Sequence, residues 1–219
     1  MAYPACYQLS QARPQTFVSN NAKSAEKGAR HSYYWAKGLC QLKGNPMKRV
    51  MIIGGSGSGK STLARRLGNL TGIPVIHMDP MYYKPGWIMR PKDVYAQMSL
   101  DALKGKFWIF EGNLSSTMAA RLDASDVFIF LDIGTTRRLW RVIWRTIRHY
   151  GKPRPDMASG CPERFEWAFL KFVAGYNRRG RVGAFEILRL AKTQHKWYHV
   201  KTNAGLDQLF QDALHRARH

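Results

Sequence analysis

The segment RVMIIGGSGSGKST, residues 49–62, restricts the fold of this chain more than any other stretch of its sequence. A short apolar run stops at a glycine-rich turn, and the turn ends in a lysine and two hydroxyl side chains. Gly54, Gly59, Lys60 and Ser61 match GxxxxGK[ST], which is typical of a phosphate-binding loop between a strand and a helix. Glycines let successive backbone N–H groups converge on phosphate oxygens, and the helix N-terminus adds a positive potential. The sequence therefore predicts a nucleotide phosphate site.

The pattern also assigns roles within this loop. We expect Lys60 to reach the β- and γ-phosphates of ATP and the Ser61 hydroxyl to hold Mg²⁺. The residues expected to bind ATP are Gly54, Gly55, Ser56, Gly57, Ser58, Gly59, Lys60, Ser61 and Thr62.

The rest of the chain predicts an α/β fold. Five short apolar runs read as strands, and they are continuous rather than alternating, which is typical of strands covered on both faces. Helical patterns separate them, so we expect a five-stranded parallel sheet flanked by helices, with ligands at the carboxyl ends of the strands. A closing amphipathic helix is predicted over GLDQLFQDALHRA, 205–217. The predicted strands span 49–53, 74–77, 107–110, 127–132 and 196–201.

Two segments differ in composition from the predicted sheet. Residues 1–46 contain Glu26 as their only acid and show no sustained period, so we expect a disordered extension before a domain spanning 47–219. An extension upstream of a natural start at Met47 and a transit peptide are the alternatives. Residues 137–181 carry twelve basic and three acidic residues, and we expect a helical, arginine-rich lid there.

Composition bears on the binding partners and the cellular compartment of the protein. The formal charge of +21 suits either nucleic-acid binding or a site for polyphosphate, and it does not choose between them. The three cysteines are odd in number and widely separated, so we expect a reducing compartment and a cytoplasmic location. No apolar run approaches the roughly 20 residues that span a bilayer, so no membrane partner is expected.

Several classes of nucleotide-hydrolysing protein do not fit. The chain lacks the guanine-reading NKxD and the transporter signature LSGGQ. Motor-type ATPases place a water-activating glutamate directly after the strand aspartate, but Ile133 follows Asp132 here. A compact phosphoryl-transferring enzyme remains.

The motifs IGGSGSGKSTLA, PVIHMDPMYYKPGW, FEGNLSSTMAARL, ASDVFIFLD, RPDMASGCPE and YNRRGR together carry a resemblance over about 48–189. They resemble the P-loop nucleotide kinases of the adenylate-kinase and shikimate-kinase-like group, and are most similar to the small bacterial family called "DNA topology modulation protein". The resemblance implies a P-loop NTPase fold and an ATP-dependent phosphotransferase.

Four side chains outside the loop are candidates for the chemistry. Asp79 follows the second predicted strand, where related kinases place an acid near the acceptor. The alternative is that Asp79 is an ordinary turn aspartate before Pro80. Glu111 stands where adenylate-kinase-like proteins carry aspartate, which implies a place near Mg²⁺. Arg121 resembles the arginine that points toward the transferred group, although a solvated helix charge is equally consistent with the sequence. Arg145 is our candidate from the lid.

The basic stripe containing Arg145 is harder to interpret. Arg138, Arg141, Arg145 and Arg148 recur at helical spacing, and such a stripe is usually a solvated face. Here it leads into a Pro/Gly-rich connection typical of a lid, and NRRGR at 177–181 adds further arginines. We expect one or two of these arginines to contact phosphate.

The expected acceptor is a small molecule, a nucleoside or nucleotide rather than a sugar acid. The surplus of arginine favours an acceptor that already carries phosphate. Asn113 is a candidate for hydrogen bonding to this acceptor, and the aromatic loop MYYKPGW, 81–87, for covering it. The rival interpretation is a nucleic-acid-associated P-loop ATPase or DNA-binding regulator. For a kinase we expect only weak, non-specific nucleic-acid binding, and a monomer or dimer.

Overall fold

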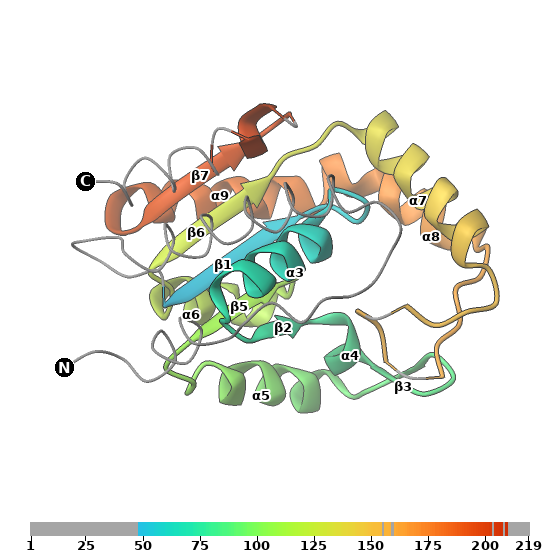
Figure 1. The fold of residues 1–219 in the computed structure, drawn as a ribbon, viewed down its shortest axis with the longest axis horizontal. Helices are drawn as coiled ribbons and strands as arrows, with labels where there is room; N and C mark the ends of the chain where they lie inside the picture. Colours follow the sequence, from blue (N-terminus) through green and yellow to red (C-terminus); the bar gives the residue numbers. More distant parts are fainter. Residues whose placement is uncertain (1–47, 155, 159, 203, 208, 210–219) are drawn as a thin grey trace, which may run out of the picture.

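The computed structural model describes residues 48–154, 156–158, 160–202, 204–207 and 209 (Figure 1). The expected N-terminal extension, 1–46, lies outside the described residues, and so does most of the closing helix predicted over 205–217.

A five-stranded parallel sheet forms the centre of the molecule, in the order β2-β5-β1-β6-β7. This confirms the predicted fold class, and each predicted strand is present within one or two residues of its expected ends. β1 is central, between β5 and β6, so the loop that follows it opens at the middle of the carboxyl edge (Figure 1). The strands are β1 (Arg49–Gly54), β2 (Val75–His77), β5 (Trp108–Glu111), β6 (Val127–Leu131) and β7 (Lys196–Val200).

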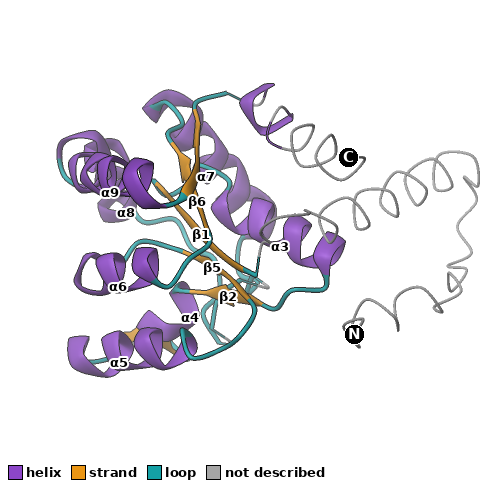
Figure 2. Cartoon of the chain, turned by 90° about the vertical axis from the view of Figure 1, so that its left-hand side faces the viewer, coloured by secondary structure: helices purple, strands orange, loops and turns teal. Residues whose placement is uncertain are grey.

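Helices cover both faces of this sheet because alternate strand residues point to opposite sides. Val50 and Ile52 pack with Leu63 and Leu67 of α3 (Lys60–Thr71) on one face. Met51 and Ile53 pack on the other face with α6 (Met118–Asp123) and α9 (Gly180–Gln194), as Figure 2 shows edge-on. Helix α3 ends at Gly72, which adopts a left-handed conformation and donates its N–H to the Gly68 carbonyl.

The aromatic loop at 81–87 is folded into regular elements. It contributes to α4 (Asp79–Tyr82) and to a short antiparallel hairpin, β3 (Tyr83–Lys84) and β4 (Ile88–Met89). The indole N–H of Trp87 donates to the Pro162 carbonyl at 3.1 Å, and the Gly86 N–H donates to the Gly160 carbonyl at 2.8 Å. The hairpin is therefore held against the connection between α7 (Thr135–His149) and α8 (Trp167–Ala174). The remaining helices are α5 (Lys92–Ala102), η1 (Ser115–Thr117) and η2 (Gly175–Arg178).

Helix α7 turns part of its basic stripe inward. Arg138 is completely buried, whereas Trp140 and Trp144 are 65% and 54% exposed. Arg138 donates to the carbonyls of Ile133 and Val173 at 2.9 and 3.1 Å, so its charge is solvated by protein groups. The usual interpretation of such a stripe as a solvated face is wrong for Arg138, because short-range backbone acceptors replace water.

No helix among the residues that the structure describes is both long and apolar enough to cross a bilayer.

Candidate active site

The predicted phosphate-binding loop lies at the carboxyl end of β1 and leads into α3. Gly59, the N-cap residue of α3, has a φ of 99°, and neither a side-chain cap nor an acidic residue in the first turn neutralises this helix N-terminus. Gly57 has a φ of 80°, and a Cβ there would lie 2.5 Å from the Arg138 carbonyl oxygen, so only glycine fits. Lys60 Nζ donates to the Gly55 carbonyl at 3.3 Å, back across the loop. This geometry fits the phosphates of a nucleotide.

Asn113 fixes the beginning of the loop. Its side-chain amide donates to the Gly54 carbonyl at 2.8 Å, and its Oδ1 accepts from the Gly54 N–H at 3.2 Å. The Tyr82 hydroxyl donates to the Asn113 carbonyl at 2.7 Å. The expected role of Asn113, hydrogen bonding to the acceptor, does not match this placement, because its side chain is already bonded at both ends to Gly54.

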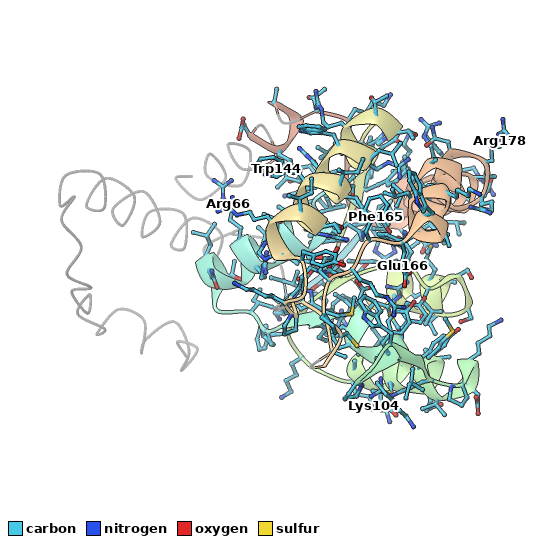
Figure 3. The ribbon with its side chains drawn as sticks, turned by 90° about the vertical axis from the view of Figure 1, so that its right-hand side faces the viewer. Arg66, Lys104, Trp144, Phe165, Glu166 and Arg178 are labelled. Carbon is cyan, nitrogen blue, oxygen red and sulfur yellow. The ribbon has the colours of Figure 1, made fainter. Side chains whose placement is uncertain are left out.

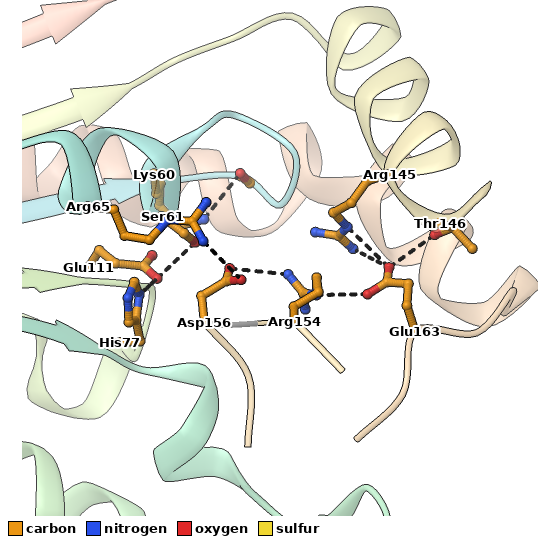
Figure 4. A network of polar contacts seen from close by, with 11 residues as sticks. Lys60, Ser61, Arg65, His77, Glu111, Arg145, Thr146, Arg154, Asp156 and Glu163 are labelled. Atoms are coloured by element: carbon orange, nitrogen blue, oxygen red, sulfur yellow. Dashed lines mark hydrogen bonds and ion pairs between the residues drawn. The ribbon is translucent and has the colours of Figure 1, made fainter. Parts of the chain in front are cut away.

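Ser61 and Glu111 form the oxygen-rich centre of the site (Figure 4). The Ser61 hydroxyl donates to Glu111 Oε1 at 2.9 Å, and His77 Nδ1 lies 2.7 Å from the same oxygen. Burial alone would raise the pKa of Glu111, but the hydrogen bond from His77, the Lys60 charge and the Ser61 hydroxyl outweigh it and lower that pKa. Glu111 is therefore held as a carboxylate.

This pair suits a hard divalent cation, since Mg²⁺ takes oxygen ligands and completes its shell with water and phosphate oxygens. Within the described parts of the chain, no group of three His, Cys, Asp or Glu side chains stands together as a metal site. Ser61 and Glu111, whose side-chain oxygens lie 2.9 Å apart, are groups that could hold Mg²⁺ beside a bound nucleotide.

Asp79 begins α4, two residues beyond the end of β2. Burial raises the pKa of its carboxyl, and the neighbouring Glu111 charge raises it further, while Lys60 and Arg154 act in the opposite direction. A carboxylate with a raised pKa is a stronger base than an exposed one. The role of Asp79 near the acceptor stays a prediction.

A chain of charged side chains connects the lid to α3 (Figure 4). Glu163, buried in the connection after α7, pairs with Arg145 at 2.9 Å and with Arg154 at 2.7 Å. Arg154 also pairs with Asp156 at 3.3 Å, and Asp156 lies 4.0 Å from Arg65 of α3. Figure 3 views this side of the molecule, with Trp144 of α7 above Phe165 and Glu166 of the connection. Through Asp156 and Arg65, the lid connection lies beside α3, the helix that follows the phosphate-binding loop.

Arg121 and Arg145, our candidate catalytic arginines, are both engaged by protein groups. Arg121 is fully buried and donates to the carbonyls of Gly112 and Leu114 at 2.9 and 3.2 Å; desolvation lowers its pKa to about 10. It fixes the chain that follows Glu111, which is a positioning role. Arg145 is bonded to Glu163. Their contact with a transferred phosphoryl group stays a prediction that these partners do not favour.

Arg181 of the NRRGR segment also has an acidic partner. Its guanidinium forms two bonds to Asp132 at 2.7 and 2.9 Å, and His199 Nε2 lies 3.0 Å from Asp132. Arg181 and Asp132 thus join α9 to the end of β6.

Sequence reasoning did not identify Arg65, Arg154, Asp156 or Glu163 as site residues. Arg154, Asp156 and Glu163 stand in the motif RPDMASGCPE, and the two acids are isolated within a strongly basic segment, whereas Arg65 carried no signal. A buried acid between several arginines is a candidate ion-pair centre, but the partner of each can be read only from the folded chain.

Comparison with known proteins gives little beyond the fold. No family model matches this chain, and no curated protein matches it. Among solved structures, a deoxyadenosine kinase from M. mycoides with bound dCTP is 13% identical to this chain and has a TM-score of 0.39. The alignment covers 75% of this chain and 97% of the kinase. A gluconokinase from Sinorhizobium meliloti is 16% identical, covers 78% and 92%, and has a TM-score of 0.43. These are weak likenesses of chain path, and they carry no information on substrate.

Proposed function

We propose that this chain is an ATP-dependent phosphotransferase that transfers the γ-phosphoryl group to a small acceptor, a nucleoside or nucleotide. One observation carries the proposal: the loop after β1, the Ser61–Glu111 oxygen pair and Asp79 meet at the carboxyl edge of one parallel sheet. A phosphate site, a place for Mg²⁺ and a base are the parts that phosphoryl transfer needs.

The protein groups divide the work of the proposed reaction. Backbone N–H groups of the loop and Lys60 hold the phosphates, and bound Mg²⁺ would neutralise their charge. An acceptor oxygen attacks the γ-phosphorus; its bond to phosphorus forms while the bond to the bridging oxygen of the departing ADP breaks. The proton of the acceptor hydroxyl passes to the Asp79 carboxylate.

Lys60→Ala tests this proposal. We expect ADP release that depends on an acceptor to fall by about 100-fold or more, since Lys60 is expected to hold the β- and γ-phosphates. Circular dichroism should show an unchanged fold. Lys104→Ala is the matched control, because Lys104 is 80% exposed and pairs only locally with Asp101. Undiminished turnover in Lys60→Ala would refute the proposal.

The rival function is a nucleic-acid-associated P-loop ATPase, which would agree with membership of the "DNA topology modulation" group. It is favoured by the stacked, exposed Trp140 and Trp144, whose rings are 6.2 Å apart on a basic helix. DNA affinity measured against salt, with and without ATP, separates the two. Tight, sequence-selective binding at physiological salt supports the rival; weak and steeply salt-dependent binding reflects net charge alone.

A further inference from the structure

His77 is a largely buried polar residue of the candidate site to which the proposed reaction gives no role. It ends β2, and in the parallel sheet it is the register partner of Glu111, which ends β5. Its ring Nδ1 lies 2.7 Å from Glu111 Oε1 (Figure 4). A carboxylate oxygen only accepts hydrogen bonds, so Nδ1 carries the hydrogen and donates it. The imidazole is thus a hydrogen-bond donor to one of the two groups suited to Mg²⁺.

The backbone around this pair leaves it little freedom. The Met78 N–H donates to the Glu111 carbonyl at 3.1 Å, which fixes the residue after His77 against the neighbouring strand. A Cβ on Gly112 would lie only 2.3 Å from the Cβ of Met78, so the two strand ends are closely packed. The side chains of His77 and Glu111 are 14% and 4% exposed. The sheet therefore sets the contact between them.

Both hydrogen bonds to this carboxylate end on the same oxygen. The Ser61 hydroxyl donates to Glu111 Oε1 at 2.9 Å, beside the bond from His77. Oε2 is then the oxygen with which Glu111 would bind a cation. Ca²⁺ takes more oxygen ligands than Mg²⁺ in a flexible geometry and often binds both oxygens of a carboxylate, whereas Mg²⁺ is smaller, demands octahedral geometry and keeps several waters. A carboxylate limited to one oxygen therefore suits Mg²⁺ better than Ca²⁺.

We propose, on the basis of the function proposed above, that His77 is a positioning residue that makes this site select Mg²⁺ over Ca²⁺. Together with Ser61 it occupies Oε1 of Glu111 and restricts the carboxylate to binding through one oxygen. His77 touches neither the cation nor the nucleotide in this role and acts through Glu111. Removing a hydrogen-bond partner of a metal ligand typically lowers metal affinity by about 10- to 100-fold.

Metal competition tests the proposal without turnover. Mn²⁺ is bound to the protein together with β,γ-imido-ATP, a non-hydrolysable analogue, with protein in excess of the analogue. Electron paramagnetic resonance then measures the free Mn²⁺ that Mg²⁺ or Ca²⁺ displaces. In His77→Leu, which removes the donor, we expect Mg²⁺ affinity to fall by about 10-fold and Ca²⁺ affinity to fall less, because Oε1 becomes available to Ca²⁺.

Two further variants isolate the donor. His77→Asn keeps a side-chain N–H near the position of Nδ1 and should restore most of the preference for Mg²⁺. His195→Leu is the matched control, because His195 Nδ1 also lies 3.0 Å from a protein oxygen, the Ser125 carbonyl, but beside the starts of β6 and β7. We expect its ratio of Mg²⁺ to Ca²⁺ affinity to equal that of the unaltered protein.

The outcomes separate this inference from the proposed function. Equal losses of Mg²⁺ and Ca²⁺ affinity in folded His77→Leu overturn the selectivity role and leave the phosphotransferase proposal standing, as does a His77→Asn protein that is impaired as much as His77→Leu. A protein that binds no Mn²⁺ beyond what the analogue binds alone overturns both. If His77→Leu does not fold, the unaltered protein decides: the bound analogue should prefer Mg²⁺ over Ca²⁺ more strongly than the free analogue does, and an equal preference overturns the inference.

Discussion

The phosphate-binding loop and the lid connection, 150–166, differ in whether protein groups balance their positive charge. The loop presents backbone N–H groups and an uncapped helix N-terminus, so its positive potential is left for a ligand. The lid connection pairs Arg154 with Asp156 and Glu163, and Arg164 with Glu166. The comparison shows that a high formal charge does not locate an anion site: the loop, which contains a single lysine, is more available to phosphate than the arginine-rich lid.

A second difference concerns where each region finds its contacts. The loop makes its turns with its own glycines, at positions that need a left-handed backbone, such as Gly57 and Gly59. Asn113 and Arg141 add hydrogen bonds to Gly54 and Ser58 from outside it. The lid is held by Arg145 of α7 and approaches Arg65 of α3, which lie far apart in the sequence. The turns of the loop are therefore encoded locally, whereas the lid depends on the assembled fold.

The largest effect should come from Asp79→Asn, which leaves both regions in place and removes only the proposed base. We expect kcat to fall by about 10²- to 10⁴-fold, the usual contribution of a positioned base, with ATP binding retained. Because the pKa of Asp79 is raised above 3.8 in the folded protein, kcat/KM should decline as pH falls through that raised value. The decline should be absent from the residual activity of Asp79→Asn. A variant with the unaltered pH profile would exclude Asp79 as the base.

Glu163→Gln removes a carboxylate from the lid network and leaves the residues of the phosphate-binding loop unchanged. The change leaves Arg145 and Arg154 without their shared buried carboxylate, so we expect the free energy of unfolding to fall by about 3 kcal/mol. Denaturant titration measures this loss. Glu186→Gln is the matched control, since the exposed Glu186–Arg189 pair should contribute less than about 1 kcal/mol. Equal losses in the two variants would mean that the lid network is no more stabilising than a surface ion pair.

The Glu163 variant also separates the two regions functionally. The free energy of ATP binding, measured by calorimetry, should change by less than the free energy of unfolding, because the loop keeps its backbone geometry and Lys60. A complete loss of ATP binding in folded Glu163→Gln would contradict the local encoding of the loop.

The parts of this protein that sequence patterns predicted are those set by local periodicity and backbone chemistry. Continuous apolar runs such as VFIFLD gave the buried strands, and the GxxxxGK[ST] spacing located the loop, because both depend on neighbouring residues. The inward direction of Arg138 was not predictable from helical spacing, since the carbonyls that receive it come from Ile133 and from Val173. The same limit applies to Asn113, whose partner Gly54 is far from it in sequence.

Removing residues 1–46 should have the smallest effect and sharpen the same comparison. The start of β1 is fixed within the described chain, because the backbone N–H groups of Lys48 and Arg49 donate to Asp126 at 3.2 and 2.9 Å. The loop follows this strand directly, so neither it nor the lid network needs an upstream residue for the contacts described here. We expect the protein starting at Met47 to bind ATP unchanged and to melt within about 2 °C of the full chain, as for changes worth less than about 0.5 kcal/mol. Scanning calorimetry of both proteins measures the difference. A fall of more than about 4 °C would show that residues 1–46 stabilise the domain, and weaker ATP binding by the shortened protein would show that the loop depends on them.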